Sequence, residues 1–210
     1  MNEISAKASK LINSNTFVNG IAYGLTAGLW SRYYSENLDF VWTQSQILIL
    51  FLVSYVINTI ASKKINFRKR MFNLRNKIGL FTKLFDITTI ILFMITNNPV
   101  ILIIGDTVAC CCSITESIAW TELNSATFNG NFRAVHSARN EKASNLGNMI
   151  AYVISMFVAI FLIGDKPISY EVLLITQWLM AIITTFTFFR TLKLFRMVKP
   201  LVEEMWSNPR

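Results

Sequence analysis

The sequence has few charged residues, which excludes an ordinary soluble domain. Asp, Glu, Lys and Arg make up only 15% of its 210 residues, against about 25% in a typical soluble protein. Hydrophobic residues account for 53%. A soluble chain of this composition would expose large apolar patches to water. We therefore expect lipid to surround much of its surface.

Residues that perform enzyme chemistry or bind metals are also scarce. The only histidine is His136, and the three cysteines are consecutive, which is not the spacing of a zinc or redox pair. The sequence contains no nucleophile–base arrangement and no glycine-rich phosphate loop. It therefore predicts no enzyme, no metal site and no cofactor. The net charge of +8 is dispersed between apolar runs, which argues against a nucleic-acid partner.

Six apolar runs of about 20 residues are each long enough to cross a bilayer. They predict an all-α, polytopic membrane protein with one six-helix domain over residues 1–210. Asn98-Pro99 predicts a tight turn, because proline cannot continue the preceding helix. Asp165-Lys166-Pro167 predicts a second short turn. The six predicted spans are 17–34, 42–61, 78–97, 100–120, 145–164 and 170–189.

The basic residues predict which side faces the cytoplasm. The N-terminal segment, the 62–77 loop, the 121–144 loop and the C-terminal tail hold 17 of the 20 Lys and Arg residues. The other side holds only Arg32 and Lys166. Because basic loops stay in the cytoplasm, we expect a multi-pass protein of the cell membrane with both termini in the cytoplasm.

Small residues recur at every fourth position in two of the predicted spans. This spacing puts them on one helix face, where a neighbouring backbone can come close. The pattern predicts close helix packing inside the bundle, and a sliding seam between moving parts is the alternative. The residues are Gly20, Gly24 and Gly28 in the first span and Gly147, Ala151 and Ser155 in the fifth.

Charged side chains inside a span are costly, so each needs a physical reason. Lys83 and Glu116 lie at similar depths near the cytoplasmic ends of adjacent spans, and we expect a structural ion pair between them. Asp86 lies deeper in the third span, one helical turn from Lys83. That spacing allows a contact between Asp86 and Lys83.

Asp106 is the charged residue that is hardest to explain by structure alone. It lies roughly 10 Å inside the outer end of the fourth span, at 1.5 Å per residue, and shares a helix face with Cys110, Ser113 and Ser117. A face of small polar residues suits a water-filled cavity. Asp106 is therefore a candidate proton or cation site, with Asp86 as the next acid. A packing acid held by hydrogen bonds is the alternative.

The first span carries a polar face of its own. Asn19, Tyr23, Thr26 and Trp30 follow one another at steps of four, three and four residues, which places them on one side of a helix. Aromatic and hydrogen-bonding groups at this spacing suit a substrate path. Ordinary hydrogen bonding between helices is the alternative.

The layout resembles the N-terminal half of a major facilitator superfamily transporter. The similarity lies in six helices, cytoplasmic ends, a basic second loop and a polar loop after the fourth helix. The second loop keeps the basic pair Arg68-Lys69 but lacks the family's two glycines and its Asp. The motif that carries the resemblance includes Glu122-Leu123-Asn124, Phe128, Arg133, Ser137, Lys142, Ser144 and Leu146-Gly147.

The resemblance implies a half-size secondary transporter for a small-molecule substrate. The two halves of such transporters are parallel repeats, so a parallel homodimer, or a second membrane subunit, would supply the missing half. The alternative is a membrane binding or accessory protein that does not transport, such as an immunity protein or the substrate-binding subunit of a vitamin importer.

Overall fold

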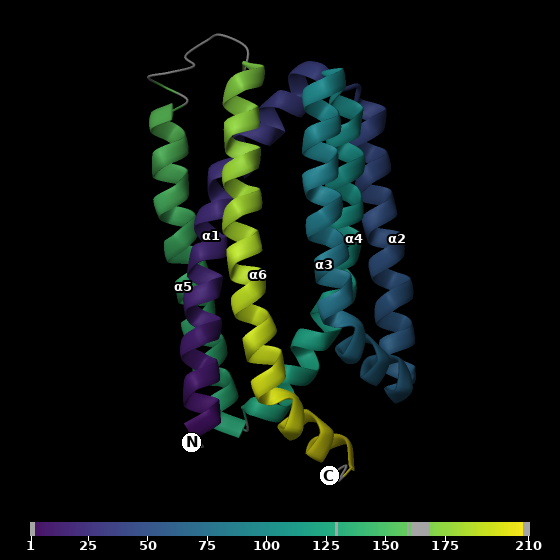
Figure 1. Ribbon diagram of the computed structural model, residues 1–210, viewed down its shortest axis with the longest axis vertical. Helices are drawn as coiled ribbons and strands as arrows, with labels where there is room; N and C mark the ends of the chain where they lie inside the picture. Colours follow the sequence, from purple (N-terminus) through teal and green to yellow (C-terminus); the bar gives the residue numbers. More distant parts are fainter. Residues whose placement is uncertain (1–2, 129, 159, 161–168, 208–210) are drawn as a thin grey trace. The chain divides into compact units, whose positions relative to one another are not determined.

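The computed structural model is all-helical in the part of the chain that it describes, which is residues 3–128, 130–158, 160 and 169–207. The turn predicted at Asp165-Lys166-Pro167 lies outside these residues. The helices follow one another along the chain (Figure 1) as α1 (Glu3–Asn37), α2 (Phe40–Lys63), α3 (Ile65–Thr96), α4 (Pro99–Thr127), α5 (Gly130–Phe157) and α6 (Tyr170–Ser207).

Four of these helices are long and apolar enough to cross a membrane, namely α2, α3, α4 and α6. They identify the chain as a helical membrane protein. They contain the second, fourth and sixth predicted spans, and the third except for Asn97. Polar residues and glycines interrupt the apolar sequence of α1, and the described part of α5 begins with a long polar stretch. Six spans therefore stay a prediction, and residues 159 and 161–164 of the fifth lie outside the described chain.

The segments expected to be loops are largely helical. α3 begins at Ile65, so most of the basic 62–77 segment extends the third helix. α4 continues to Thr127 and α5 begins at Gly130, so the polar 121–144 segment is helical as well. The 62–77 segment is rich in Lys, Arg and other residues with good helix propensity. Polar composition marked where the apolar runs end, and the helices continue beyond those points.

The turn between α3 and α4 forms where Asn98-Pro99 predicts it. Asn97 ends α3 in the left-handed conformation, with φ of 50°, and its N–H donates to the carbonyl of Phe93. Asparagine tolerates this conformation better than most residues. Pro99 is the first residue of α4, a position where its missing N–H costs nothing. The side-chain oxygen of Asn98 accepts a hydrogen bond from the N–H of Val100.

The chain folds into two compact units, and α1, α4 and α6 each contribute residues to both. The single domain that we expect remains a prediction. The first unit contains Met1–Gly28, Thr121–Gly164 and Ile182–Arg210. The second unit contains Leu29–Trp120 and Asp165–Ala181.

In the first unit, α1 packs against α5 and α6. Contacts between α1 and α5 rise together in residue number, from Ser9–His136 to Gly24–Ser155, so these helices run parallel. Contacts between α1 and α6 run in opposite order, from Asn15–Thr191 to Asn19–Thr187. The two non-consecutive helices α1 and α5 are therefore parallel neighbours.

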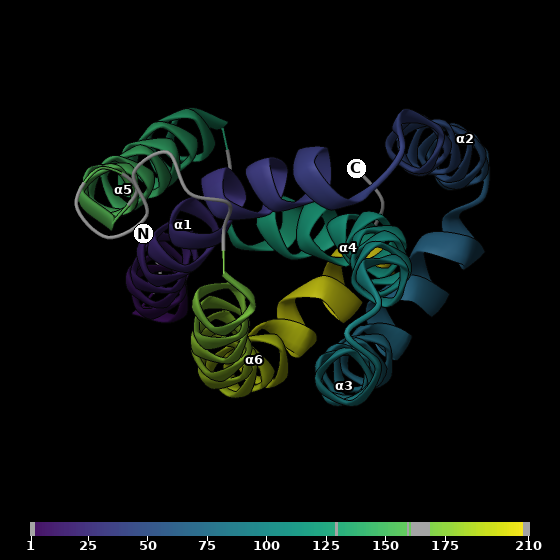
Figure 2. The same cartoon turned by 90° about the horizontal axis from the view of Figure 1, so that it is seen from above.

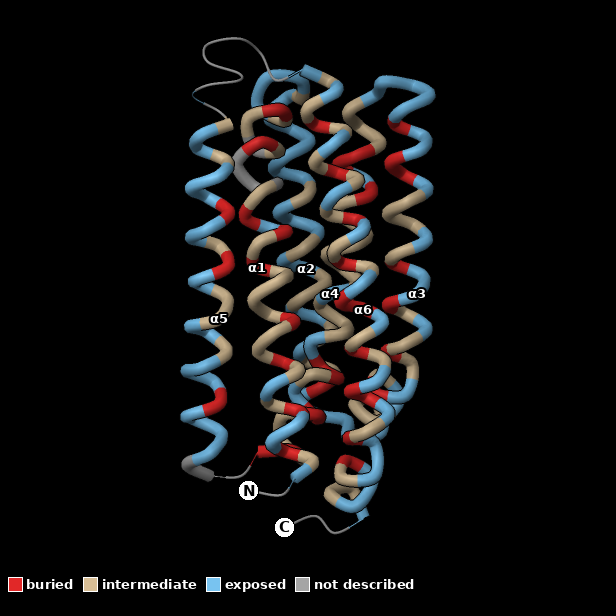
Figure 3. The backbone as a smooth tube through the Cα atoms, turned by 60° about the vertical axis from the view of Figure 1, so that its left-hand side comes forward, coloured by how far each residue is buried: buried red, intermediate tan, exposed pale blue. Residues whose placement is uncertain are grey.

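In the second unit, α2, α3 and α4 form a group that Figure 2 shows end on. Side-chain contacts join α4 both to α2 and to α3. Figure 3 shows that α2 is pale blue along most of its length, and Ala61 is its one buried residue. The apolar side chains of α2, such as Phe51 and Leu52, are exposed, as expected of a helix that faces lipid.

Candidate functional site

The candidate site lies in the second unit, where α4 meets α2. The Gln46 side chain of α2 donates a hydrogen bond of 2.6 Å from Nε2 to Oδ2 of Asp106. One helical turn along α4, the Cys110 thiol donates to Oδ1 of Asp106 at 3.8 Å. Asp106 is half-buried. Its carboxyl group is thus held by two uncharged donors, one of which belongs to another helix.

Gln46 was not found by sequence analysis, which identified no partner for Asp106. Gln46 lies near the outer end of α2 and Asp106 near the outer end of α4, in the orientation that we predict. Composition does not show which helices pack together or in which direction. The contact between Gln46 and Asp106 is therefore visible only in the structure. A polar amide within an otherwise apolar helix was the available signal, because such groups seek partners across helices.

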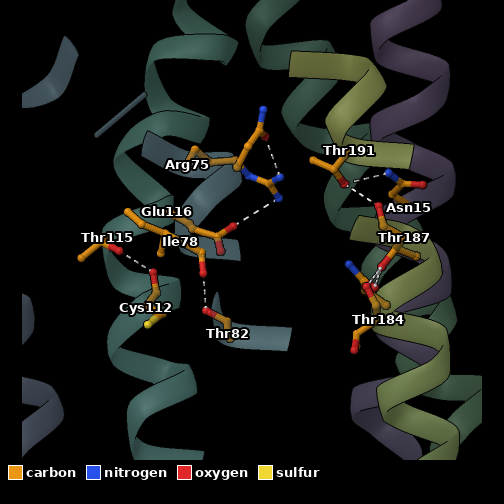
Figure 4. Close-up of polar contacts among 12 residues, drawn as sticks. Asn15, Arg75, Ile78, Thr82, Cys112, Thr115, Glu116, Thr184, Thr187 and Thr191 are labelled. Carbon is orange, nitrogen blue, oxygen red and sulfur yellow. Dashed lines mark hydrogen bonds and ion pairs between the residues drawn. The ribbon is translucent and has the colours of Figure 1, made fainter. Parts of the chain in front are cut away.

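Two other acids of the second unit, Glu116 and Asp86, have cationic partners. Arg75 Nη2 of α3 lies 3.2 Å from Glu116 Oε2 of α4, and Figure 4 shows the two side chains pointing toward each other. Lys83 Nζ lies 3.2 Å from Asp86 Oδ2, the contact that their spacing allows. We expected Lys83 to pair with Glu116; the ion pair that the structure shows for Glu116 is with Arg75.

The residues of the polar face predicted on the first span lie in different surroundings. The Asn19 carbonyl oxygen accepts a 2.7 Å hydrogen bond from the Thr187 hydroxyl of α6, which is ordinary contact between helices. Tyr23 is exposed, and the side chain of Thr26 lies outside the described residues. Trp30 belongs to the second unit. Ser113, predicted beside Asp106 on α4, is exposed.

The two stripes of small residues lie against each other in the first unit. A Cβ added to Gly20 would stand 2.8 Å from the carbonyl oxygen of Ser144, and one added to Gly24 would stand 2.6 Å from Cβ of Ala151. The Ser155 hydroxyl donates to the backbone carbonyl of Gly24 at 3.3 Å. An added Cβ on Gly147 would collide with the carbonyl oxygen of Phe17. The surroundings of Gly28 lie outside the described residues.

A polar contact between α1 and α6, which sequence analysis missed, lies one turn from Asn19. Asn15 donates from Nδ2 to the Thr191 hydroxyl at 3.3 Å, and Thr191 donates in turn to the carbonyl of Thr187 at 2.6 Å. Figure 4 shows these side chains between the two helices. Asn15 and Thr191 are both buried, so this set of hydrogen bonds holds the helices in register.

The side chain of His136 is held by contacts with its neighbours. Its ring stacks on Phe128 with centroids 3.8 Å apart, and Nδ1 lies 3.0 Å from the Ser9 hydroxyl oxygen. Burial, with a smaller contribution from Arg139, lowers the pKa of His136 from its ordinary 6.5. Among the described residues there is no group of three or more His, Cys, Asp or Glu side chains that could hold a metal ion.

No protein-family model, curated protein or solved structure matches the chain. The class therefore comes from the structure: a helical membrane protein, in whose described residues four helices are long and apolar enough to cross a membrane.

Proposed function

We propose that the chain is a half-size secondary transporter that works as a parallel homodimer, with Asp106 as its proton-coupling group. The chemistry of the partners of Asp106 carries the proposal. Glu116 and Asp86 each face a cationic side chain, whereas Asp106 is bonded to an amide and a thiol. An ionisable group in a membrane helix is costly and is a functional candidate, above all when no cation offsets it.

Gln46 is a suitable partner for a group that gains and loses a proton. Its amide carries both donor N–H groups and an acceptor oxygen. It donates to Asp106 in the present arrangement, and its oxygen is able to accept from a protonated carboxyl group. A Lys or Arg at position 46 would instead favour the ionised form alone. The neutral pair is therefore compatible with both states of a coupling cycle.

The resemblance of the layout to one half of a transporter supports the homodimer in this proposal. A secondary transporter of the resembled family places its substrate between two parallel six-helix repeats. One copy of this chain supplies one repeat, and a second copy related by an axis along the membrane normal would supply the other.

Proteoliposomes that contain the purified chain and an internal pH-sensitive dye test the proposal. A panel of small molecules is added outside under an imposed pH gradient. We expect at least one compound to move protons in the wild type and none to do so in Asp106→Asn. Asp39→Asn is the matched control, because Asp39 is exposed and makes no side-chain cap to α2. Equal fluxes for Asp106→Asn and wild type would disprove the coupling role.

The second candidate is a membrane binding or accessory protein that does not transport. The observation that favours it is that each oxygen of Asp106 already has a donor, as a packing acid would. In that case compounds raise the thermal stability of the purified chain, but none moves protons into the proteoliposomes.

A further inference from the structure

The N-terminal part of α3 carries basic side chains that have no acidic neighbours in the sequence. The 62–77 segment holds seven Lys and Arg residues, and no Asp or Glu occurs from residue 40 to residue 85. Figure 1 shows the first turns of α3 slanting away from the end of α2, before the rest of α3 runs alongside α2. Four of the seven basic residues are exposed, namely Lys63, Lys64, Arg70 and Lys77. These four side chains are therefore open to a partner outside the chain.

Glu116 of α4 pairs with this segment from its buried side. It lies 3.2 Å from Arg75, and Arg75 is buried. Arg70 and Lys77 are exposed instead, and within the described part of the chain neither makes an ion pair or a side-chain hydrogen bond. Their positive charges are therefore without a counter-ion among the described residues.

The buried and the exposed residues of α3 lie on opposite sides of the helix. The buried residues follow one another at steps of three, four and three, and are Phe72, Arg75, Gly79 and Thr82. The exposed residues follow one another at steps of three, four, three and four, and are Arg70, Asn73, Lys77, Leu80 and Leu84. Each set keeps to one side of an α-helix at this spacing. The exposed face of α3 therefore passes continuously from basic to apolar side chains.

The change from basic to apolar coincides with the predicted edge of the bilayer. Lys77 directly precedes the third predicted span, 78–97, and Leu80 lies about 4.5 Å further along the helix axis. Leu80 and Leu84 have exposed fractions of 50% and 58%. Basic side chains at the end of a spanning helix extend to the level of the lipid headgroups. The exposed face of α3 thus presents cations at headgroup level and apolar side chains at the level of the acyl chains.

We propose that the exposed face of α3 binds an anionic phospholipid. Arg70 and Lys77 hold the phosphate group, and an acyl chain lies along Leu80 and Leu84. Arg70 and Lys77 are about 10 Å apart along the helix axis, a separation that their long side chains close on one headgroup. A lipid fits this face better than a soluble phosphate compound, which would leave Leu80 and Leu84 uncovered. The inference goes beyond the proposed transport function and does not depend on it.

Native mass spectrometry of the purified full chain in detergent tests the inference. The chain is titrated with phosphatidylglycerol or with phosphatidylcholine of the same acyl chains, and the dissociation constant of the first bound lipid is measured. Attraction of about fivefold for each of two basic side chains gives a preference of about 25-fold for phosphatidylglycerol. Arg70→Gln and Lys77→Gln should each lower this preference about fivefold. Together they should bring the two lipids within about threefold of each other.

Two further double variants separate the site from the overall charge of the chain. Lys10→Gln with Lys142→Gln removes two exposed basic residues on the same predicted side of the membrane, and we expect the wild-type preference. Arg70→Lys with Lys77→Arg keeps both charges, and the preference should stay within about threefold of wild type. The unfolding temperature in detergent checks that each variant folds, as expected for substitutions at exposed residues.

Glycerol phosphate distinguishes a lipid from a soluble phosphate, because it carries the charge of the headgroup without acyl chains. We expect that it does not displace phosphatidylglycerol. Displacement by glycerol phosphate would overturn the inference in favour of a soluble ligand. The inference also fails if the Arg70 and Lys77 double Gln variant keeps the preference, if the Lys10 and Lys142 variant loses as much, or if exchanging Arg and Lys abolishes the preference.

Discussion

Arg75 of α3 and Glu116 of α4 form an ion pair from which water is largely excluded. Their nitrogen–oxygen distance is 3.2 Å, and the exposed fractions of the two side chains are 5% and 16%. The Arg75 guanidinium also lies over the Trp120 ring, 6.0 Å from its centroid. The pair fastens two apolar helices of the second unit to each other.

Removing one partner of this pair should destabilise the protein strongly. Arg75→Met leaves the Glu116 carboxylate buried without its counter-ion, and we expect a loss of about 3–5 kcal/mol. Arg75→Met combined with Glu116→Leu should recover most of that loss. Thermal unfolding in detergent measures the stability of the single and the double variant. Lys7→Met is the control, because the Lys7–Glu3 pair is exposed and should contribute at most about 1 kcal/mol.

Gly147→Ala should loosen the contact between α1 and α5. The added methyl group meets the backbone of Phe17, which has no flexible end to move aside, and overpacking of this kind costs about 1–3 kcal/mol. The unfolding temperature in detergent is the measurement. Ala134→Leu enlarges an exposed residue of the same helix and should change little. Equal stability of Gly147→Ala and wild type would contradict the packing described for Gly20 and Gly147.

Thr187→Val should weaken the contact between α1 and α6 by about 1 kcal/mol. The substitution keeps the shape of the side chain but removes the hydroxyl that donates to Asn19 at 2.7 Å. Thr88→Val is the matched control, since Thr88 is exposed and its hydroxyl bonds within its own helix. A double variant with Asn19→Leu would show coupling between the two positions if they interact directly.

The stability of the first unit should fall on acidification because of His136. Its pKa is lowered in the folded protein, so below about pH 6.5 the unfolded chain binds a proton that the folded chain resists. The loss begins near that pH and grows as the pH falls through the folded pKa, with a slope of at most about 1.4 kcal/mol per pH unit. His136→Gln should have a shallower dependence between pH 7.5 and 5.5 in unfolding experiments.

Membrane orientation is tested by labelling. In a chain whose native cysteines are replaced by Ala, we expect Asn66→Cys and Gly130→Cys to resist an impermeant thiol reagent in intact cells, because basic segments stay inside. Glu171→Cys, at an exposed residue on the opposite predicted side, should react. Labelling at position 66 or 130 in intact cells would reverse the orientation.

Composition and spacing predicted the membrane class, the α3–α4 turn and the small-residue faces, because these depend on local hydropathy and on helical period. They did not predict which side chains of different helices contact each other. Asp106 and Gln46 are 60 residues apart in the sequence. Arg75 is able to pair with Glu116 because it lies within the helical extension of α3 and not in a loop. Trp30 was predicted on one face with Asn19, but the two residues belong to different units, because one face of a long helix meets different neighbours along its length.

The parallel contact of α1 with α5 has a consequence for biosynthesis. α1 emerges from the ribosome before α5, yet among the described residues it is not one of the helices apolar enough to cross a membrane by themselves. The groups that cover its glycines belong to α5, and the hydroxyl that bonds Asn19 comes 168 residues later. During translation, α1 must therefore wait for most of the chain to be made before its polar and small-residue faces are enclosed. Nascent chains that end before α5 would present these faces to the insertion machinery and to quality-control proteases.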